Sequence, residues 1–144
     1  MVINGPNLKR LDLRERQFYG DFDYPTLEKF LFDCANAEGF EIEVRQSDDE
    51  AVLIAWLHEA ADKEMPVIIN PAAFTHYSYA IRDAVSMLRA PVIEVHLSNP
   101  LSREEFRHTS VVSGVVNGTI AGFGKNSYRL ALIAMRELIA DLTK

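Results

Sequence analysis

Short apolar stretches alternate with stretches of helical periodicity along the chain, and this alternation limits the possible folds more than any other feature. The apolar stretches at 66–70 and 92–95 are typical of strands that are covered on both faces. Between such stretches, apolar residues recur every three or four positions, which predicts helices. Strands that alternate with helices favour a parallel sheet. We therefore predict an α/β fold, doubly wound and flavodoxin-like, in which helices cover both faces of a five-stranded parallel sheet.

The same patterns give the expected order of elements. Strands are expected at 1–4, 40–45, 66–70, 92–95 and 119–122. Helices are expected to follow Pro25, Ser47–Glu50, His76 and Gly122–Gly124. The last helix is expected to bury Leu130, Ala134, Leu138 and Leu142. Ser102 and Glu105 fit a capping box, which predicts a short helix with Arg103 and Arg107 on one face.

The chain length and composition limit the class of protein. With 144 residues we expect one domain, 1–144. The net charge of −6 gives no indication of a nucleic-acid or anionic membrane partner. A single cysteine excludes an internal disulfide and any metal site with several cysteines. No apolar run is long enough to span a bilayer, and a cytoplasmic location is expected.

Polar residues follow three of the predicted strands. Asn7, Asn70 and His96 all fall at or just beyond carboxyl ends, which meet at one edge of a parallel sheet. Ligands of doubly wound sheets bind outside this edge. The charged segment Leu8–Gly20 leaves from the same edge, and two interpretations of it stay open: a lid that carries Tyr19, or a solvated loop with one packed tyrosine.

The residue types at this edge favour acid–base chemistry. No glycine-rich phosphate loop is visible, and the four histidines lack the spacing of metal ligands. Tyr19 follows Arg14 and Arg16 closely, and guanidinium groups favour the anionic form of a phenol. Glu94 precedes His96 by two residues and would hold its ring in one tautomer. A base and an acid on different elements suit the removal of a proton together with the departure of a hydroxyl group.

Six motifs in register give a specific resemblance. They are Asn4-Gly5-Pro6-Asn7-Leu8, Arg14-Glu15 with Tyr19-Gly20, Gln46-Ser47, Asn70-Pro71 with Thr75-His76, Ile81-Arg82-Asp83-Ala84, and Glu94–Asn99 with Arg103–Arg107. In these motifs the chain resembles the type II 3-dehydroquinate dehydratases. The resemblance implies a lyase that converts 3-dehydroquinate to 3-dehydroshikimate and water by anti elimination through an enolate, without cofactor or metal. The reaction is common to aromatic amino-acid biosynthesis and quinate breakdown. The resemblance also implies a homododecamer, built as four trimers.

The resemblance assigns roles by position. Tyr19 would be the base, supported as tyrosinate by Arg14, and His96 would be the acid, oriented by Glu94. Asn7 would hold a water on the enolate oxygen. The expected substrate contacts are Asn70, Ser98 and the backbone of Leu97 at the carboxylate, His76 and Arg107 at ring hydroxyls, and Asp83 in a neighbouring subunit's site. Arg103 would lie near the lid and help to close it or support the tyrosinate.

The chain departs from the family pattern at several places. Arg16 replaces the usual proline of the lid motif, and the extra cation is expected to favour tyrosinate. Ala72 replaces a usual glycine, which predicts strain if the position needs a positive φ. Pro100-Leu101 alters the loop behind His96. The departures at the lid and at Ala72 leave open a paralogue that binds without turnover. An unrelated flavin or phosphate binder is a further alternative, against which the lack of a visible phosphate-cradling loop counts.

Overall fold

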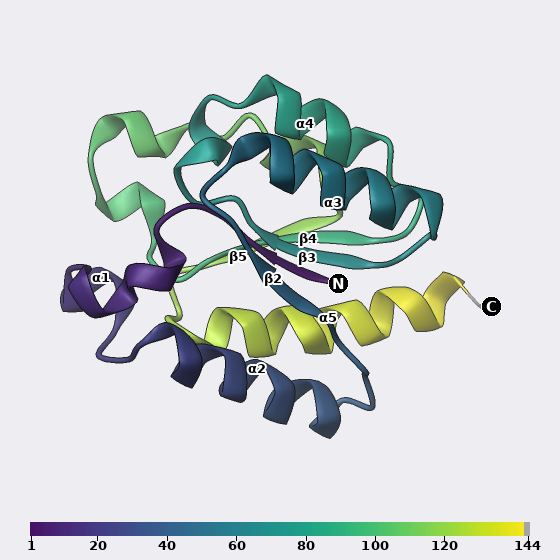
Figure 1. The fold of residues 1–144 in the computed structure, drawn as a ribbon, viewed down its shortest axis with the longest axis horizontal. Coiled ribbons are helices and arrows are strands. Elements are labelled where there is room, and N and C mark those ends of the chain that lie inside the picture. Colours follow the sequence, from purple (N-terminus) through teal and green to yellow (C-terminus); the bar gives the residue numbers. More distant parts are fainter. Residues whose placement is uncertain (143–144) are drawn as a thin grey trace.

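A computed structural model describes residues 1–142 of the chain, and its centre is a parallel sheet (Figure 1). The strands in this range are β1 (Val2–Asn4), β2 (Val44–Gln46), β3 (Val67–Asn70), β4 (Val92–His96) and β5 (Gly118–Ala121). They pair in the order β2-β1-β3-β4-β5 and all run parallel. This order is the flavodoxin-like one, so the predicted fold is confirmed. The expected domain, 1–144, includes residues 143 and 144, which lie outside the described residues.

In the part of the chain that the structure describes, two helices cover each face of the sheet. α3 (Glu50–Asp62) and α4 (Tyr79–Ser86) lie on one face, and α2 (Tyr24–Ala37) and α5 (Asn126–Leu142) lie on the other (Figure 1). Each pair of helices encloses its own hydrophobic core with the sheet. Because apolar cores cover both faces of the sheet, the ends of the strands are the place where polar side chains can gather.

The strands alternate between these two cores with a period of two. Val67 and Ile69 belong to the core under α3 and α4, whereas Ile68 between them belongs to the core under α2 and α5. Val2 and Ile3 divide in the same way. Because successive strand side chains point to opposite faces, apolar runs without polar interruption are what a doubly covered sheet requires.

Side-chain caps define where three helices begin. The carboxylate of Asp23 accepts a hydrogen bond from Thr26 N at 2.9 Å at the start of α2, where Pro25 occupies the first turn. The Ser78 hydroxyl accepts from Ile81 N at 3.0 Å at the start of α4. At α3 the cap is Asp49, which accepts from Ala51 N, and so the capping box expected at Ser47 does not form.

Two further predictions of local structure are wrong, one of them only in part. The last helix buries Tyr128, Ala131, Leu132 and Met135. Of the predicted inner stripe, Ala134 and Leu138 pack partly buried against this core, whereas Leu142 is 70% exposed. No helix begins at Ser102: 3₁₀ turns cover Pro100–Ser102 and Glu105–His108, and Arg103 between them is extended. The Ser102 hydroxyl donates to Asn99 O instead of capping a helix.

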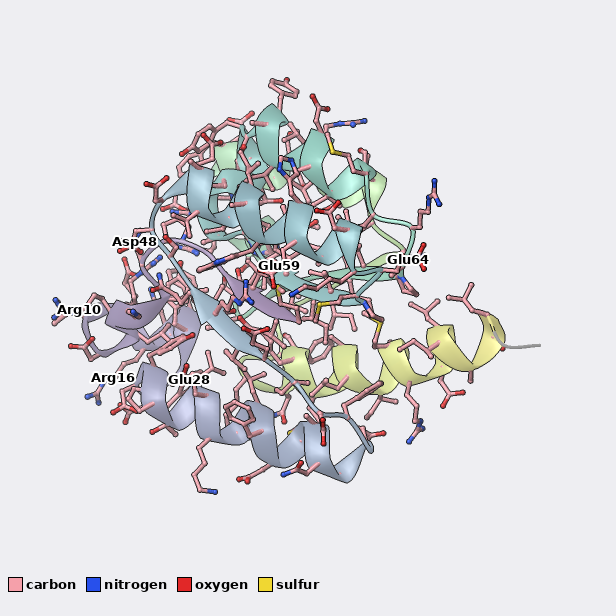
Figure 2. All side chains as sticks on the ribbon, turned by 45° about the vertical axis from the view of Figure 1, so that its right-hand side comes forward. Arg10, Arg16, Glu28, Asp48, Glu59 and Glu64 are labelled. Carbon is pink, nitrogen blue, oxygen red and sulfur yellow. The ribbon has the colours of Figure 1, made fainter. Side chains whose placement is uncertain are left out.

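The charged segment between β1 and α2 is more ordered than its lack of periodicity indicated. It forms a 3₁₀ segment, Leu8–Leu13, and one helical turn, α1 (Arg16–Tyr19). Leu8, Leu11 and Tyr19 are buried, whereas Arg10 and Arg16 project outward (Figure 2). Within residues 1–142 none of the helices combines the length and the apolar character that crossing a membrane would need.

Candidate active site

A cavity of about 310 Å³ opens at the carboxyl edge of the sheet, where the segments after β1, β3 and β4 meet. In a doubly wound sheet the order reverses between β1 and β3, and ligands bind at that point. Ten residues predicted for the site line this cavity: Asn7, Arg14, Tyr19, Asn70, His76, His96, Leu97, Ser98, Arg103 and Arg107. Tyr19 and His96 therefore share one cavity although 77 positions separate them in the sequence.

The Tyr19 phenol lies between two guanidinium groups. Arg14 Nη2 and Arg103 Nη1 both donate to its oxygen, the latter at 2.6 Å. The Arg14 guanidinium carbon also lies 4.0 Å from the centre of the Tyr19 ring. Because Tyr19 as a whole is only 8% exposed, few water molecules compete for these contacts. Such an environment suits a phenol oxygen that carries negative charge.

Arg16 does not take part in this arrangement. Its side chain is 78% exposed and pairs with Asp21 at 3.2 Å. The expectation that the extra cation favours tyrosinate is therefore wrong for Arg16. The second cation comes instead from Arg103, which follows β4 and is held in place by a hydrogen bond from Nη1 to the Ser98 hydroxyl at 3.2 Å. The turn of α1 directs Arg16 to solvent.

His96 and Glu94 form a buried acid–base pair at the end of β4. His96 Nε2 lies 2.7 Å from Glu94 Oε1, and the Glu94 side chain is completely enclosed. Burial would raise the pKa of Glu94, but the hydrogen bonds from His96, Ser113 and Thr75 outweigh it and the pKa is lowered from its ordinary value. An ionised carboxylate only accepts hydrogen bonds, so Nε2 carries a proton and Nδ1 is left for a ligand.

Three hydroxyl groups around Glu94 were not predicted. Thr75 donates to Oε1 and Ser113 donates to Oε2 at 2.5 Å. The Ser110 hydroxyl lies 2.7 Å from the Thr75 hydroxyl. Ser110 is the donor of this pair, because Thr75 already donates its single hydroxyl proton to Glu94. Ser113 lies in a segment whose sequence indicated only irregular structure, and no motif connects it to Glu94. The sequence holds no signal that would have identified these hydroxyls as partners of Glu94.

His76 stands on the 3₁₀ turn that follows β3. Its Nδ1 donates to Thr109 O at 2.8 Å, which leaves Nε2 as an acceptor. Burial lowers the pKa of His76, the Thr109 hydrogen bond opposes this, and the nearby His96 and Arg107 lower it further. His76 is therefore a neutral ring with one free acceptor near neutral pH. Arg107, also at the cavity, is held by Glu104 at 2.7 Å.

The segment after β3 is shaped by a close approach of backbones. A Cβ atom on Gly5 would lie 2.8 Å from the carbonyl carbon and oxygen of Pro71, so only glycine fits after β1. Ala72 has φ of 51°, which confirms that this position uses the left-handed region and that alanine is strained there. Ala72 N donates to Asn70 Oδ1 at 3.1 Å, which ties the strained residue to the side chain that lines the cavity.

Asp83 lies apart from this cavity, exposed on α4. Asp83 is expected to reach the site of a neighbouring subunit, and this role stays a prediction because the structure describes a single chain. Within residues 1–142 there is no group of three or more His, Cys, Asp and Glu side chains that could hold a metal ion.

Comparisons with known proteins agree with this geometry. The family model of class II dehydroquinases matches residues 1–136. The 3-dehydroquinate dehydratase of Halalkalibacterium halodurans is 52% identical over 137 residues, which cover 95% of this chain and 94% of the relative. The enzyme of the same name from Salinispora tropica is 53% identical over 131 residues, 91% of this chain and 92% of the relative.

Solved structures give the same answer. The crystal structure of the type II dehydroquinase from Propionibacterium acnes is similar with a TM-score of 0.92 and 51% identity, over 94% of each chain. The structure from Butyrivibrio crossotus, also a type II dehydroquinase, has a TM-score of 0.90 and 43% identity over 93% of this chain and 94% of that one. Sequence motifs, fold and relatives agree, and the chain belongs to the class II dehydroquinase family.

Proposed function

We propose that this enzyme removes water from 3-dehydroquinate to give 3-dehydroshikimate, with Tyr19 as the base and His96 as the acid of an anti elimination. The observation that carries the proposal is the placement of a doubly guanidinium-bound phenol and a carboxylate-bound imidazole in one cavity. The name of its relatives supports the substrate. The contacts of this chain support the roles of Tyr19 and His96.

The first step is the removal of a proton from the carbon beside the ketone. The phenolate of Tyr19 takes this proton, and the electrons of the C–H bond move toward the ketone oxygen as an enolate. Arg14 and Arg103 neutralise the phenolate before the step. Asn7, which also lines the cavity, would hold a water molecule on the enolate oxygen.

The second step is the loss of the hydroxyl group. His96 Nδ1 gives its proton to the leaving oxygen, the C–O bond breaks, and the enolate electrons form the carbon–carbon double bond as water departs. Before the step the imidazolium carries a positive charge, which the Glu94 carboxylate neutralises from 2.7 Å. After the step the ring keeps its proton on Nε2 and is neutral. Glu94 can therefore accept the same hydrogen bond from Nε2 in the charged and in the neutral state of His96.

The remaining cavity residues suit a small carboxylated ring. Asn70, Ser98 and the backbone of Leu97 would bind the carboxylate, and all three residues are buried at strand ends. His76 offers a free acceptor to a ring hydroxyl, and Arg107 offers donors to another. Each group has fixed neighbours, so the substrate would meet donors and acceptors that are already oriented.

We also propose that the chain acts as a homododecamer of four trimers, in which Asp83 reaches the site of a neighbour, and that it works in the cytoplasm. The exposure of Asp83 on α4, beside the exposed side chains of Tyr79 and Met87, supports a subunit contact there. Sedimentation analysis is expected to give a particle of twelve times the 16.3 kDa chain mass. A monomer at enzyme concentrations that sustain turnover would contradict the assembly.

A direct absorbance assay tests the reaction. The parent enzyme is expected to convert 3-dehydroquinate to an enone that absorbs in the ultraviolet. Tyr19→Phe and His96→Ala are expected to abolish product formation, whereas the matched controls Tyr77→Phe and His58→Ala change exposed side chains outside the cavity and are expected to keep it. No absorbance change at high concentrations of the parent enzyme would refute the proposal.

A further inference from the structure

The Tyr128 side chain of α5 has no role in the mechanism above, yet its hydroxyl reaches the polar strand ends from below the sheet. It donates to Asn4 Oδ1 at 2.6 Å and accepts from Asn70 Nδ2 at 3.0 Å. Asn4 and Asn70 are the last residues of β1 and β3 and are partners in the strand register. One phenol therefore joins the ends of two neighbouring strands at the point where the cavity lies.

The direction of each hydrogen bond in this cluster is determined. A phenol has one proton, so Tyr128, which donates it to Asn4, can only accept from Asn70. Burial raises the pKa of Tyr128, so the proton stays in place throughout the neutral range. The Asn70 oxygen accepts from Ala72 N at 3.1 Å. Both ends of the Asn70 amide are thus fixed, and a flip would break both contacts.

The orientation decides what Asn70 can offer a ligand. Of the two amide protons on Nδ2, one is used on Tyr128 and one stays available. Asn70 lines the cavity and is 3% exposed, so this second proton is a donor for a bound anion. Without Tyr128, the Ala72 contact alone opposes a turn of the amide that would present its oxygen to the anion and repel it.

We propose that Tyr128 is a positioning residue, which holds the Asn70 amide with its nitrogen toward the substrate carboxylate. This inference rests on the proposed function, because it needs an anionic group bound at Asn70. Tyr128 is completely buried and does not line the cavity. Its effect is expected in substrate binding more than in the chemical step.

The test measures KM and kcat for 3-dehydroquinate in Tyr128→Phe. We expect KM to rise about tenfold, the scale of one hydrogen bond to a charged group, with kcat within about threefold of the parent. Tyr24→Phe is the matched control: this buried tyrosine lies on the far side of the cluster, where its hydroxyl accepts from Asn4 Nδ2 at 3.4 Å. Its KM is expected to stay within twofold.

A double-mutant cycle separates positioning from general stability. If Tyr128 acts through Asn70, Tyr128→Phe changes KM less than about twofold in an Asn70→Ala background. Additive effects, or an unchanged KM together with a lower melting temperature, would overturn the inference.

If Tyr128→Phe does not fold, Asn4→Ala asks the same question. It frees the phenol proton to bind a flipped Asn70 oxygen, and an unchanged KM would again overturn the inference. Absence of turnover in the parent chain would overturn the proposed function and this inference together. Normal turnover in the parent with an unchanged KM in Tyr128→Phe overturns the inference alone.

Discussion

Replacing the buried Glu94 by glutamine tests the acid half of the mechanism with little change in shape. Glutamine can keep its oxygen at Oε1, where Thr75 and His96 donate, and place its NH₂ group where Ser113 now donates. The Ser113 hydroxyl can rotate and accept from that group. The site therefore keeps its hydrogen bonds but loses the charge that neutralises the imidazolium.

The two expected effects differ in size. A hydrogen bond to a charged group is worth about 1.5–3 kcal/mol, so loss of the charge beside His96 is expected to lower kcat by a factor of about 10–150. Glutamine loses the attraction between the carboxylate and His96, but it also avoids the desolvation cost of a buried charge. These two effects oppose each other, so the free energy of unfolding is expected to change by less than about 1 kcal/mol, or about 2–4 °C in Tm. Turnover and thermal melting of the same preparation measure both.

Two further variants complete the experiment. Glu59→Gln makes the same chemical change at a glutamate that pairs with Arg45 outside the cavity, and its kcat is expected to equal that of the parent. Glu94→Ala leaves Thr75, Ser113 and His96 without their acceptor and is expected to lower Tm as well as kcat. A kcat of Glu94→Gln within threefold of the parent would refute the role given to the carboxylate.

Three other predictions follow from the contacts of single residues. Arg14→Gln is expected to lower kcat at least tenfold by removing a charged hydrogen bond to Tyr19, whereas Arg16→Gln stays within twofold, and equal losses in steady-state kinetics would contradict this. Ala72→Gly is expected to raise the free energy of unfolding in urea by about 0.5–1 kcal/mol, because the relief of left-handed strain in the folded chain exceeds the cost of the greater unfolded-chain entropy of glycine. A lower free energy of unfolding would show that the strain is absent. Because the pKa of Glu94 is lowered in the folded chain, its carboxylate stabilises the fold at pH values above the ordinary pKa of 4.5, and this stabilisation is lost as the pH falls below that value. Between pH 7 and pH 3, the free energy of unfolding in urea is therefore expected to fall less in Glu94→Gln than in the parent, and parallel curves would contradict this.

The sheet and the edge that carries the site could be predicted because their signals are local. Apolar stretches such as 66–70 and 92–95 have few alternatives to buried strands, and the polar residue at the end of each is then fixed in space. Asn7, Asn70 and His96 meet at one cavity for this reason. The prediction that these three residues share one edge of the sheet did not depend on any contact between distant side chains.

The parts that could not be predicted depend on contacts between distant segments. The last helix has apolar residues on neighbouring stripes, so periodicity alone did not select Tyr128 over Leu130 for the core. The Ser102 signal had the spacing of a capping box, but its hydroxyl donates to Asn99 O and the chain stays extended at Arg103. Nothing in the sequence indicated that Ser113 would meet Glu94.

The most direct test of the central claim follows the two proton transfers separately, by exchange at the carbon beside the ketone of 3-dehydroquinate in deuterium oxide. With His96→Ala, the account predicts that deuterium enters this position while no 3-dehydroshikimate forms, because Tyr19 still removes the proton and the hydroxyl cannot leave. With Tyr19→Phe, it predicts neither exchange nor product by NMR. Exchange in Tyr19→Phe at the rate of the parent enzyme would show that another group is the base and would contradict the account.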